Sequence, residues 1–386
     1  MVSLSNGANR IYGEAAFEVL AKAQELERQG KNILHFEIGE PDIETPKNIV
    51  QAGIKAILDK KTHYTPSIGI LELRKAVQDE IEKTRGYRPD LEQIVITPGL
   101  KPGIFFSILN IVNPGDEVIY QDPGYPTYGS VTSFLGAKGV LIPLLEENEF
   151  RMNPNDIKEK ITEKTKLIIV NSPQNPTGSV MTKSELEEIA EIAENNDIFV
   201  VSDEIYSKMT YETKHYTPTA RDEAKERTIL LDGFSKYYAM TGWRLGYMVT
   251  PVKMAERLQD FLVSAISCTA AFTQWAGIEA LTGDQYFIPE MMARFKEKRD
   301  KIVEGLNSIP GFHCLSPKGA FYTFPNILET GMKSQECADH LLYKANVACL
   351  PGTAFGPYGE GYLRFSYATT LENIDAAIKS IKKSFK

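Results

Sequence analysis

One lysine, Lys236, occupies a position where covalent chemistry is possible. It follows the apolar run 229–231, which predicts a buried strand, and a tight turn at Gly233 and Ser235. A lysine in a turn is usually a solvated surface charge. Here, however, aromatic residues and glycines flank the turn, and a lysine in such surroundings can have a pKa well below its usual value of about 10.4. Lys236 is therefore a candidate amine nucleophile, provided that other segments complete a site around it.

A glycine-containing turn offers a place for an anion. Residues 98–103, Pro-Gly-Leu-Lys-Pro-Gly, follow a predicted strand at 94–97 and precede an apolar helix at 104–112. Such a turn directs free backbone N–H groups toward whatever lies beyond the strand, and a phosphate would fit there. The segment matches neither the Walker loop nor the dinucleotide fingerprint. An ordinary strand-to-helix turn is the alternative.

Three other predicted strands also end in polar or aromatic groups. Tyr125 could stack on a flat ligand or pack at an edge, and Asn175 could bond a ligand oxygen or form an Asx turn. Asp203 follows the run 199–201, where a buried carboxylate requires a cation or a donor. Because parallel strands present their carboxyl ends at one edge, these groups are expected to meet.

Two arginines complete the set. Arg244 precedes the apolar run 245–249, and its guanidinium is expected to be buried and to bind a phosphate in bidentate fashion. Alternation in residues 362–367 separates Arg364 from its apolar neighbours, so it is either solvated or faces the site and binds a carboxylate. Together these groups are what pyridoxal 5′-phosphate requires: a lysine for a Schiff base, an acid for the ring nitrogen and a phosphate anchor.

The elements that position these residues alternate between strands and helices. Short β-branched runs occur at 94–97, 117–120, 140–142, 167–170, 199–201, 229–231 and 245–249. The pattern predicts an α/β fold with a seven-stranded, mostly parallel sheet and helices on both faces. The last strand is expected to be antiparallel, because the connection 231–245 is too short for a crossover helix.

The segments outside the alternating region predict further helices and, at both ends of the chain, a second, smaller domain. Helical periodicity occurs at 15–29, 47–58 and 71–85, and again from 251 to about 308, and short strands are expected at 320–324 and 362–367 before a closing helix at 372–385. We therefore predict a small α+β domain made of residues 1–45 and 286–386, and a large cofactor-binding domain made of residues 46–285.

Composition excludes several classes of function. The 386 residues include 43 Lys and Arg against 51 Asp and Glu, a net charge of −8 that argues against nucleic-acid and anionic-membrane partners. No apolar run of 18 residues and no signal-peptide pattern occur, so a cytoplasmic location is expected. The four cysteines and five histidines lack metal-ligand spacing, so no metal site is expected.

Several ordered motifs resemble one known family. The segments that carry the resemblance are Gly39-Glu-Pro-Asp42, Asn171-Ser-Pro-Gln-Asn-Pro-Thr-Gly178, Ser202-Asp-Glu-Ile-Tyr206, Ser235-Lys236, Met240-Thr-Gly-Trp-Arg244 and Leu363-Arg-Phe-Ser-Tyr-Ala368. Over nearly its whole length the chain resembles the class I aminotransferases of the aspartate aminotransferase fold family, bacterial and archaeal subgroup. These are fold-type-I transferases dependent on pyridoxal 5′-phosphate.

The resemblance implies a role for each candidate residue. Lys236 would form the Schiff base and later carry the proton at the substrate α-carbon, and Asp203 would pair with the ring nitrogen. The other implied roles are Tyr206 and Asn175 on the ring hydroxyl, Tyr125 stacked on the ring, Gly99, Leu100, Lys101 and Arg244 at the phosphate with Tyr64 of a second subunit, and Arg364 on the substrate carboxylate, assisted by the Gly39 backbone and Asn175. Many relatives carry a serine at the position of Gly233, so one hydroxyl at the phosphate is expected to be missing or to be replaced by that of Ser235.

The resemblance also implies a homodimer with shared active sites, but it leaves the substrate open. Lys101 matches a lysine that can bind the distal carboxylate in relatives preferring aspartate. In those relatives a threonine of the N-terminal segment and a serine of the partner subunit also contribute, and Ala16 and Cys268 stand at these positions here. Aspartate with 2-oxoglutarate as acceptor is the leading hypothesis. The alternatives are an alanine or aromatic donor, a carbon–sulfur lyase on the same fold, and a non-catalytic cofactor-binding regulator, which lacks support because no DNA-binding helix-turn-helix is present.

Overall fold

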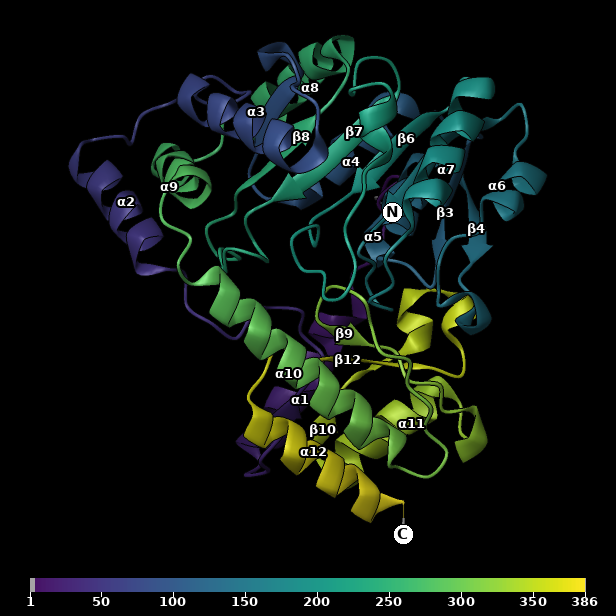
Figure 1. Ribbon diagram of the computed structural model, residues 1–386. Coiled ribbons are helices and arrows are strands. Elements are labelled where there is room, and N and C mark those ends of the chain that lie inside the picture. The colour runs from purple at the N-terminus through teal and green to yellow at the C-terminus, as the bar shows by residue number, and fades with distance from the viewer. Residues whose placement is uncertain (1–3, 386) are drawn as a thin grey trace.

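The predicted strands form one seven-stranded sheet in a computed structural model, which describes residues 4–385 (Figure 1). In spatial order the strands are β2 (Ile94–Thr97), β8 (Gly246–Val249), β7 (Thr228–Gly233), β6 (Phe199–Asp203), β5 (Thr165–Asn171), β3 (Glu117–Asp122) and β4 (Lys138–Pro143). β8 runs antiparallel to both of its neighbours, while the other pairs are parallel. The predicted α/β class and the antiparallel last strand are confirmed.

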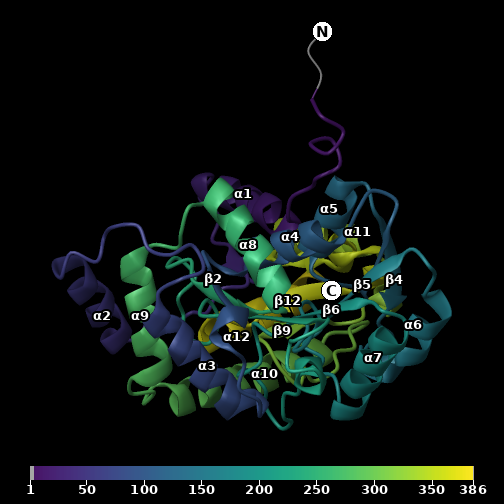
Figure 2. The same cartoon turned by 90° about the horizontal axis from the view of Figure 1, so that it is seen from above.

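Helices cover both faces of this sheet (Figure 2). One face carries α4 (Leu100–Ile111), α5 (Pro126–Leu135) and α8 (Val252–Ala265), and the other carries α3 (Leu71–Arg85), α6 (Pro154–Lys160) and α7 (Lys183–Asn195), with α2 (Lys47–Leu58) and α9 (Ala271–Thr282) packed together beyond α3. Alternate strand residues explain the two layers: Leu167 and Ile169 pack toward α4, and Ile168 and Val170 pack toward α7.

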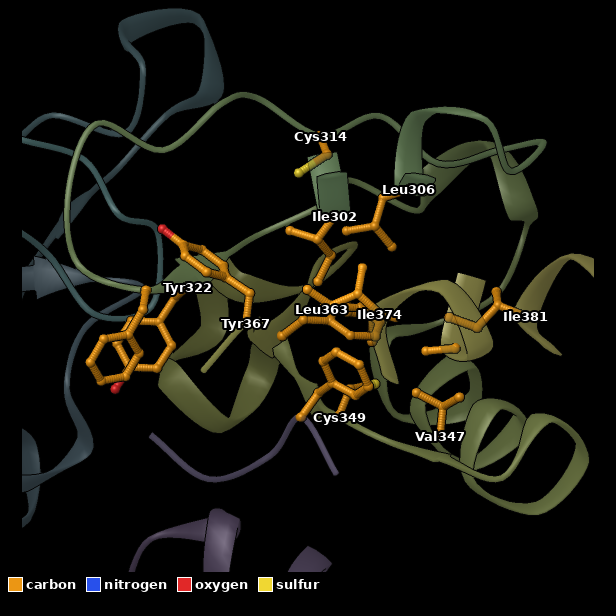
Figure 3. Close-up of a cluster of buried hydrophobic side chains, with 14 of the residues drawn as sticks. Ile302, Leu306, Cys314, Tyr322, Val347, Cys349, Leu363, Tyr367, Ile374 and Ile381 are labelled. Atoms are coloured by element: carbon orange, nitrogen blue, oxygen red, sulfur yellow. The ribbon is translucent and has the colours of Figure 1, made fainter. Parts of the chain in front are cut away.

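A smaller α+β region lies beyond the carboxyl edge of the sheet, toward which the arrowheads of β3 and β4 point in Figure 1. Its helices are α1 (Ala15–Arg28), α10 (Ile288–Asn307), α11 (Ser334–His340) and α12 (Leu371–Ser384), and its short strands are β1 (Leu34–His35), β9 (Tyr322–Thr323), β10 (Val347–Ala348), β11 (Leu350–Pro351) and β12 (Leu363–Ser366). Figure 3 shows its core, where Ile302 and Leu306 of α10 pack with Ile374 of α12.

The N-terminal segment joins this region in space. β1 pairs in parallel with β10, so Leu34 lies opposite Val347. The domain boundaries at residues 45/46 and 285/286 stay a prediction. Among the helices of residues 4–385, none is both long and apolar enough to cross a membrane.

One helix begins earlier than predicted. α4 starts at Leu100 rather than at residue 104, because Gly99 takes a positive φ of 83° and ends the preceding loop. Pro102 is tolerated because it lies in the first turn, where its missing N–H has no helical partner. The backbone N–H groups of Leu100 and Lys101 therefore lie at the open end of the helix, next to the edge of the sheet.

A buried ionic cluster connects α3 to the sheet. Arg85, at the end of α3, donates to Glu204 at 3.1 Å and to Asp232 at 2.5 Å, and all three side chains are almost fully buried. His215 Nε2 lies 2.8 Å from the same Glu204 carboxylate. Burial alone would raise the pKa of Glu204, but His215 and Arg85 lower it to about 2. The cluster therefore holds two strand ends against α3.

Arg85→Met tests this cluster. The substitution leaves two buried carboxylates without their cation, so we expect the free energy of unfolding to fall by about 3–5 kcal/mol. Urea unfolding followed by circular dichroism measures the change. Arg88→Met is the matched control, because Arg88 forms its ion pairs at the surface, and it should leave the stability close to wild type. Equal stability of the two variants would contradict a structural role for the Arg85 cluster.

Candidate active site

A cavity of about 480 Å³ lies between the carboxyl edge of the large sheet and the strands β9 and β12. It gathers nearly all of the predicted site residues. Those that line it are Gly39, Leu100, Lys101, Tyr125, Asn175, Asp203, Tyr206, Ser235, Lys236, Arg244 and Arg364. Gly99 lies beside it as the N-cap of α4. Tyr64 is 88% exposed and does not line the cavity, so its reach into a second subunit stays a prediction.

Lys236 presents its amine to this cavity. The Nζ atom donates a hydrogen bond to the carbonyl oxygen of Gly39 at 2.5 Å. The pKa of Lys236 is lowered to about 8, mainly because the amine is buried; Glu40 opposes this shift and the nearby Arg364 adds to it. At neutral pH the fraction of neutral, nucleophilic amine is therefore much larger than for an ordinary lysine.

Gly39 has a packing reason to be glycine. A Cβ atom at this position would lie 2.1 Å from the hydroxyl of Tyr322. The backbone at Gly39 can thus approach Tyr322 closely only without a side chain.

Asp203 ends β6 with a buried carboxylate that has no cationic partner among residues 4–385. The hydroxyl of Tyr128 donates to its Oδ2 atom at 2.7 Å. The pKa of Asp203 is raised to about 6, because the effect of burial outweighs the opposing effect of the Tyr128 hydrogen bond. A protonated ring nitrogen would supply the missing positive charge.

The open end of α4 and Arg244 lie together at a place suited to an anion. No side chain of the described residues caps this helix, so its first backbone N–H groups are available. The Arg244 guanidinium lies against Gly99, where a Cβ atom would come within 2.2 Å of Nη2. The expected burial of Arg244 is wrong: the residue is exposed, because it belongs to the turn before β8, has a φ of 52° and donates to the Thr241 carbonyl at 2.7 Å.

Arg364 is a buried cation that lacks an anion. It is only 4% exposed, so the solvated alternative is wrong. Its Nη1 donates to Asn175 Oδ1 at 3.3 Å and its Nη2 to the Glu37 carbonyl, while its Nε has no partner among residues 4–385. Burial lowers the pKa of Arg364. A ligand carboxylate would satisfy both its charge and its free N–H group.

The sequence did not reveal several residues of the site. Tyr128 lies in α5, three positions after the N-cap residue Tyr125. Residues three positions apart share one face of a helix, so predicting a helix here would have paired the two tyrosines. Tyr322 donates or accepts a 2.7 Å hydrogen bond with Tyr206. Glu14 lies ahead of α1 and accepts from the Tyr125 hydroxyl at 2.8 Å. No local motif distinguishes Tyr322 or Glu14. Of the two residues predicted near the substrate side chain, Ala16 lines the cavity, and the contribution of Cys268, expected from the partner subunit, stays a prediction.

The residues present fit pyridoxal 5′-phosphate. The fit rests on an amine with a lowered pKa, a buried carboxylate without a cation and an open helix end beside an arginine. Each of these features needs a group that this cofactor carries. Among residues 4–385 no cluster of histidines, cysteines and acids could hold a metal ion.

Comparisons with known proteins point the same way. The family model described as aminotransferase class I and II matches residues 31–381. The chain is 42% identical over 369 residues to a Pyrococcus horikoshii protein named aspartate aminotransferase, covering 95% of this chain and 93% of the relative. It is 38% identical to aromatic-amino-acid aminotransferase 2 of Thermococcus litoralis, covering 95% of each. The structure of Thermus thermophilus aspartate aminotransferase with maleate has a TM-score of 0.95 at 34% identity, covering 100% of both chains.

The lowered pKa of Lys236 leads to a pH-dependent prediction. Only the neutral amine attacks an aldehyde, so the rate at which the cofactor-free protein binds pyridoxal 5′-phosphate covalently should rise with pH and level off above about 8. Stopped-flow measurement of the visible absorption that accompanies attachment gives this rate. Lys236→Ala should show no covalent attachment, whereas Lys298→Met, which removes another buried lysine, should retain it. A midpoint near the ordinary lysine value of about 10.4 would contradict the lowered pKa.

Proposed function

The chain belongs to the class I and II aminotransferases and is a transaminase dependent on pyridoxal 5′-phosphate, and we propose that it transfers the α-amino group of aspartate to 2-oxoglutarate. The observation that carries the proposal is the convergence of Lys236, Asp203 and Arg364 on one cavity that also contains Lys101. The first three suit any amino acid donor. Lys101 suits a donor with a second carboxylate.

In the proposed reaction each residue has a separate task. When bound, pyridoxal phosphate supplies a carbonyl that takes the amino group and a ring that accepts the electrons released at the substrate α-carbon. Lys236 would hold the cofactor covalently and then move the proton at that α-carbon. Asp203 would keep the proton on the ring nitrogen, because a carboxylate in a buried site stabilises the adjacent positive charge. Arg364 would bind the α-carboxylate and thereby orient the α-carbon toward Lys236.

Support for an acidic donor comes from the outer part of the cavity and from relatives. Lys101 stands in the first turn of α4, about half exposed, and its ammonium faces the cavity. A distal carboxylate could pair with it there. The Pyrococcus horikoshii and Thermus thermophilus proteins are named for aspartate, and the latter was solved with the dicarboxylate maleate.

An aromatic donor is the second candidate. Phe17 and Ala16 line the same part of the cavity, so an apolar side chain would also find contacts. The Thermococcus litoralis relative is named for aromatic amino acids. The two candidates share every step at the α-carbon and differ only in what binds the donor side chain.

Single-turnover spectroscopy tests the proposed function. The visible absorption of the loaded enzyme is recorded while one amino acid is added without any oxo acid. We expect aspartate to convert the bound cofactor stoichiometrically to its amine form and 2-oxoglutarate to reverse the change. Pyruvate and ammonia accumulating from cysteine-type substrates would instead favour a lyase. Arg364→Lys, which loses bidentate geometry, should lower kcat/KM for every donor by roughly 10- to 100-fold, whereas Arg299→Lys, elsewhere in the small region, should not.

We further propose that two copies form a homodimer with shared active sites. The support is an exposed apolar strip on α2, where Ile54 is 52% and Leu58 is 75% exposed, followed by the exposed Tyr64. Such a strip is typical of a protein interface. Sedimentation equilibrium should give twice the chain mass of 43.2 kDa, and Leu58→Glu should shift the equilibrium toward the monomer. A monomeric wild type with full activity would contradict shared sites. The cytoplasmic location stays a prediction.

A further inference from the structure

One carboxylate in the active-site cavity has no place in the proposed reaction. Glu14 is the N-cap residue of α1 and lines the cavity. Its Oε1 atom lies 2.5 Å from Lys101 Nζ and accepts a hydrogen bond from the Tyr125 hydroxyl at 2.8 Å. The Glu14 side chain is 23% exposed, so water screens this pair only in part. Lys101, the cation available to a distal carboxylate, is therefore already paired.

The chain on either side fixes the position of Glu14. Before it, Arg10 Nε donates to the Ser133 carbonyl at 2.6 Å, and Tyr12 exchanges two hydrogen bonds with Ser130, at 3.0 Å and 2.7 Å. These contacts attach the segment to α5. After it, α1 packs into the small region through Ala23 and Leu26. Glu14 is thus held between two anchored segments, at a short distance from Lys101.

The negative charge of Glu14 next to Lys101 affects which donor side chains can bind there. A donor with a distal carboxylate reaches Lys101 only by displacing Glu14, which loses one ion pair to form another. The displaced Glu14 charge also remains in the cavity, next to the incoming carboxylate. A donor with an apolar side chain displaces nothing and meets a neutral pair beside Phe17, whose ring centroid is 5.9 Å from Lys101 Nζ.

We propose that Glu14 is a specificity-determining residue, which pairs with Lys101 as a displaceable counterion and so shifts the enzyme toward aromatic and other apolar donors at the expense of acidic ones. The inference rests on the proposed donor site around Lys101. It assigns to Glu14 the balance between the two donor classes, which both remain substrates.

The binding of unreactive ligands tests this role independently of catalysis. The dissociation constants of maleate and 3-phenylpropionate for the cofactor-loaded enzyme are measured by isothermal titration calorimetry. Both ligands carry one carboxylate for Arg364, so a change between variants in the ratio of the 3-phenylpropionate constant to the maleate constant reports on the site of the second carboxylate. In Glu14→Gln this ratio should rise by about tenfold, because Lys101 becomes free to bind it. The ratio of kcat/KM for aspartate to that for phenylalanine should rise in parallel.

Glu40→Gln is the matched control. It removes the same charge from the same cavity, but Glu40 bonds Thr241 and not Lys101. A general effect of charge would raise the ratio equally in both variants, and this outcome would overturn the proposal. An unchanged or lower ratio in Glu14→Gln would also overturn it.

A double variant tests whether the effect of Glu14 acts through Lys101. Lys101→Gln should abolish the gain of Glu14→Gln, because the freed cation is then absent. Glu14→Asp, which shortens the side chain, should give a smaller rise and serves if Glu14→Gln folds poorly. Retention of the full gain in Glu14→Gln/Lys101→Gln would overturn the proposal. If neither aspartate nor phenylalanine is a donor but the ratio changes as expected, the proposed function fails and the Glu14–Lys101 coupling stands.

Discussion

Ionisable side chains are buried around the cavity at the carboxyl edge of the sheet without charged protein partners, an arrangement that lowers the stability of the fold. The pKa of Asp203 is raised, and those of Lys236 and Arg364 are lowered, and burial is the largest cause of each shift. Unpaired burial costs several kcal/mol for each ion. The surrounding layers of helix and strand must therefore hold these groups in place until a ligand brings the opposite charges. The cofactor ring nitrogen and the substrate carboxylate are such charges.

Two neighbouring carboxylates at the end of β6 have different roles, one in stabilising the fold and one in the candidate active site. Asp203 and Glu204 are consecutive, so their side chains leave the backbone in different directions. Glu204 turns toward Arg85 and His215, and these partners lower its pKa to about 2. Asp203 turns into the cavity, where Tyr128 is its hydrogen-bond donor and its pKa rises to about 6. One carboxylate thus connects the sheet to α3, while the other is left free for a ligand.

The sheet and most of the site could be predicted because their signals are local. The strands of the large sheet are recognised as β-branched runs, and β2, β3, β5, β6 and β7 each end at or shortly before a candidate residue. The strands β1 and β10 could not be predicted, since two-residue strands show no alternation and pair across more than 300 positions of sequence. The exposure of Arg244 was missed for a related reason. Its position follows from a backbone with positive φ, which the residue type does not indicate.

The groups proposed to contact the donor side chain are positioned differently from those suited to the cofactor. Asp203 and Lys236 follow strands of one sheet, so their separation is set by strand spacing. Glu14 and Phe17 belong to an N-terminal segment attached to α5 by a few hydrogen bonds, and Lys101 belongs to the first turn of α4. Small changes in that segment can alter the charge near Lys101 without moving the sheet. Relatives of about 40% identity bear the names of one reaction but of different amino donors, as a separation of this kind would allow.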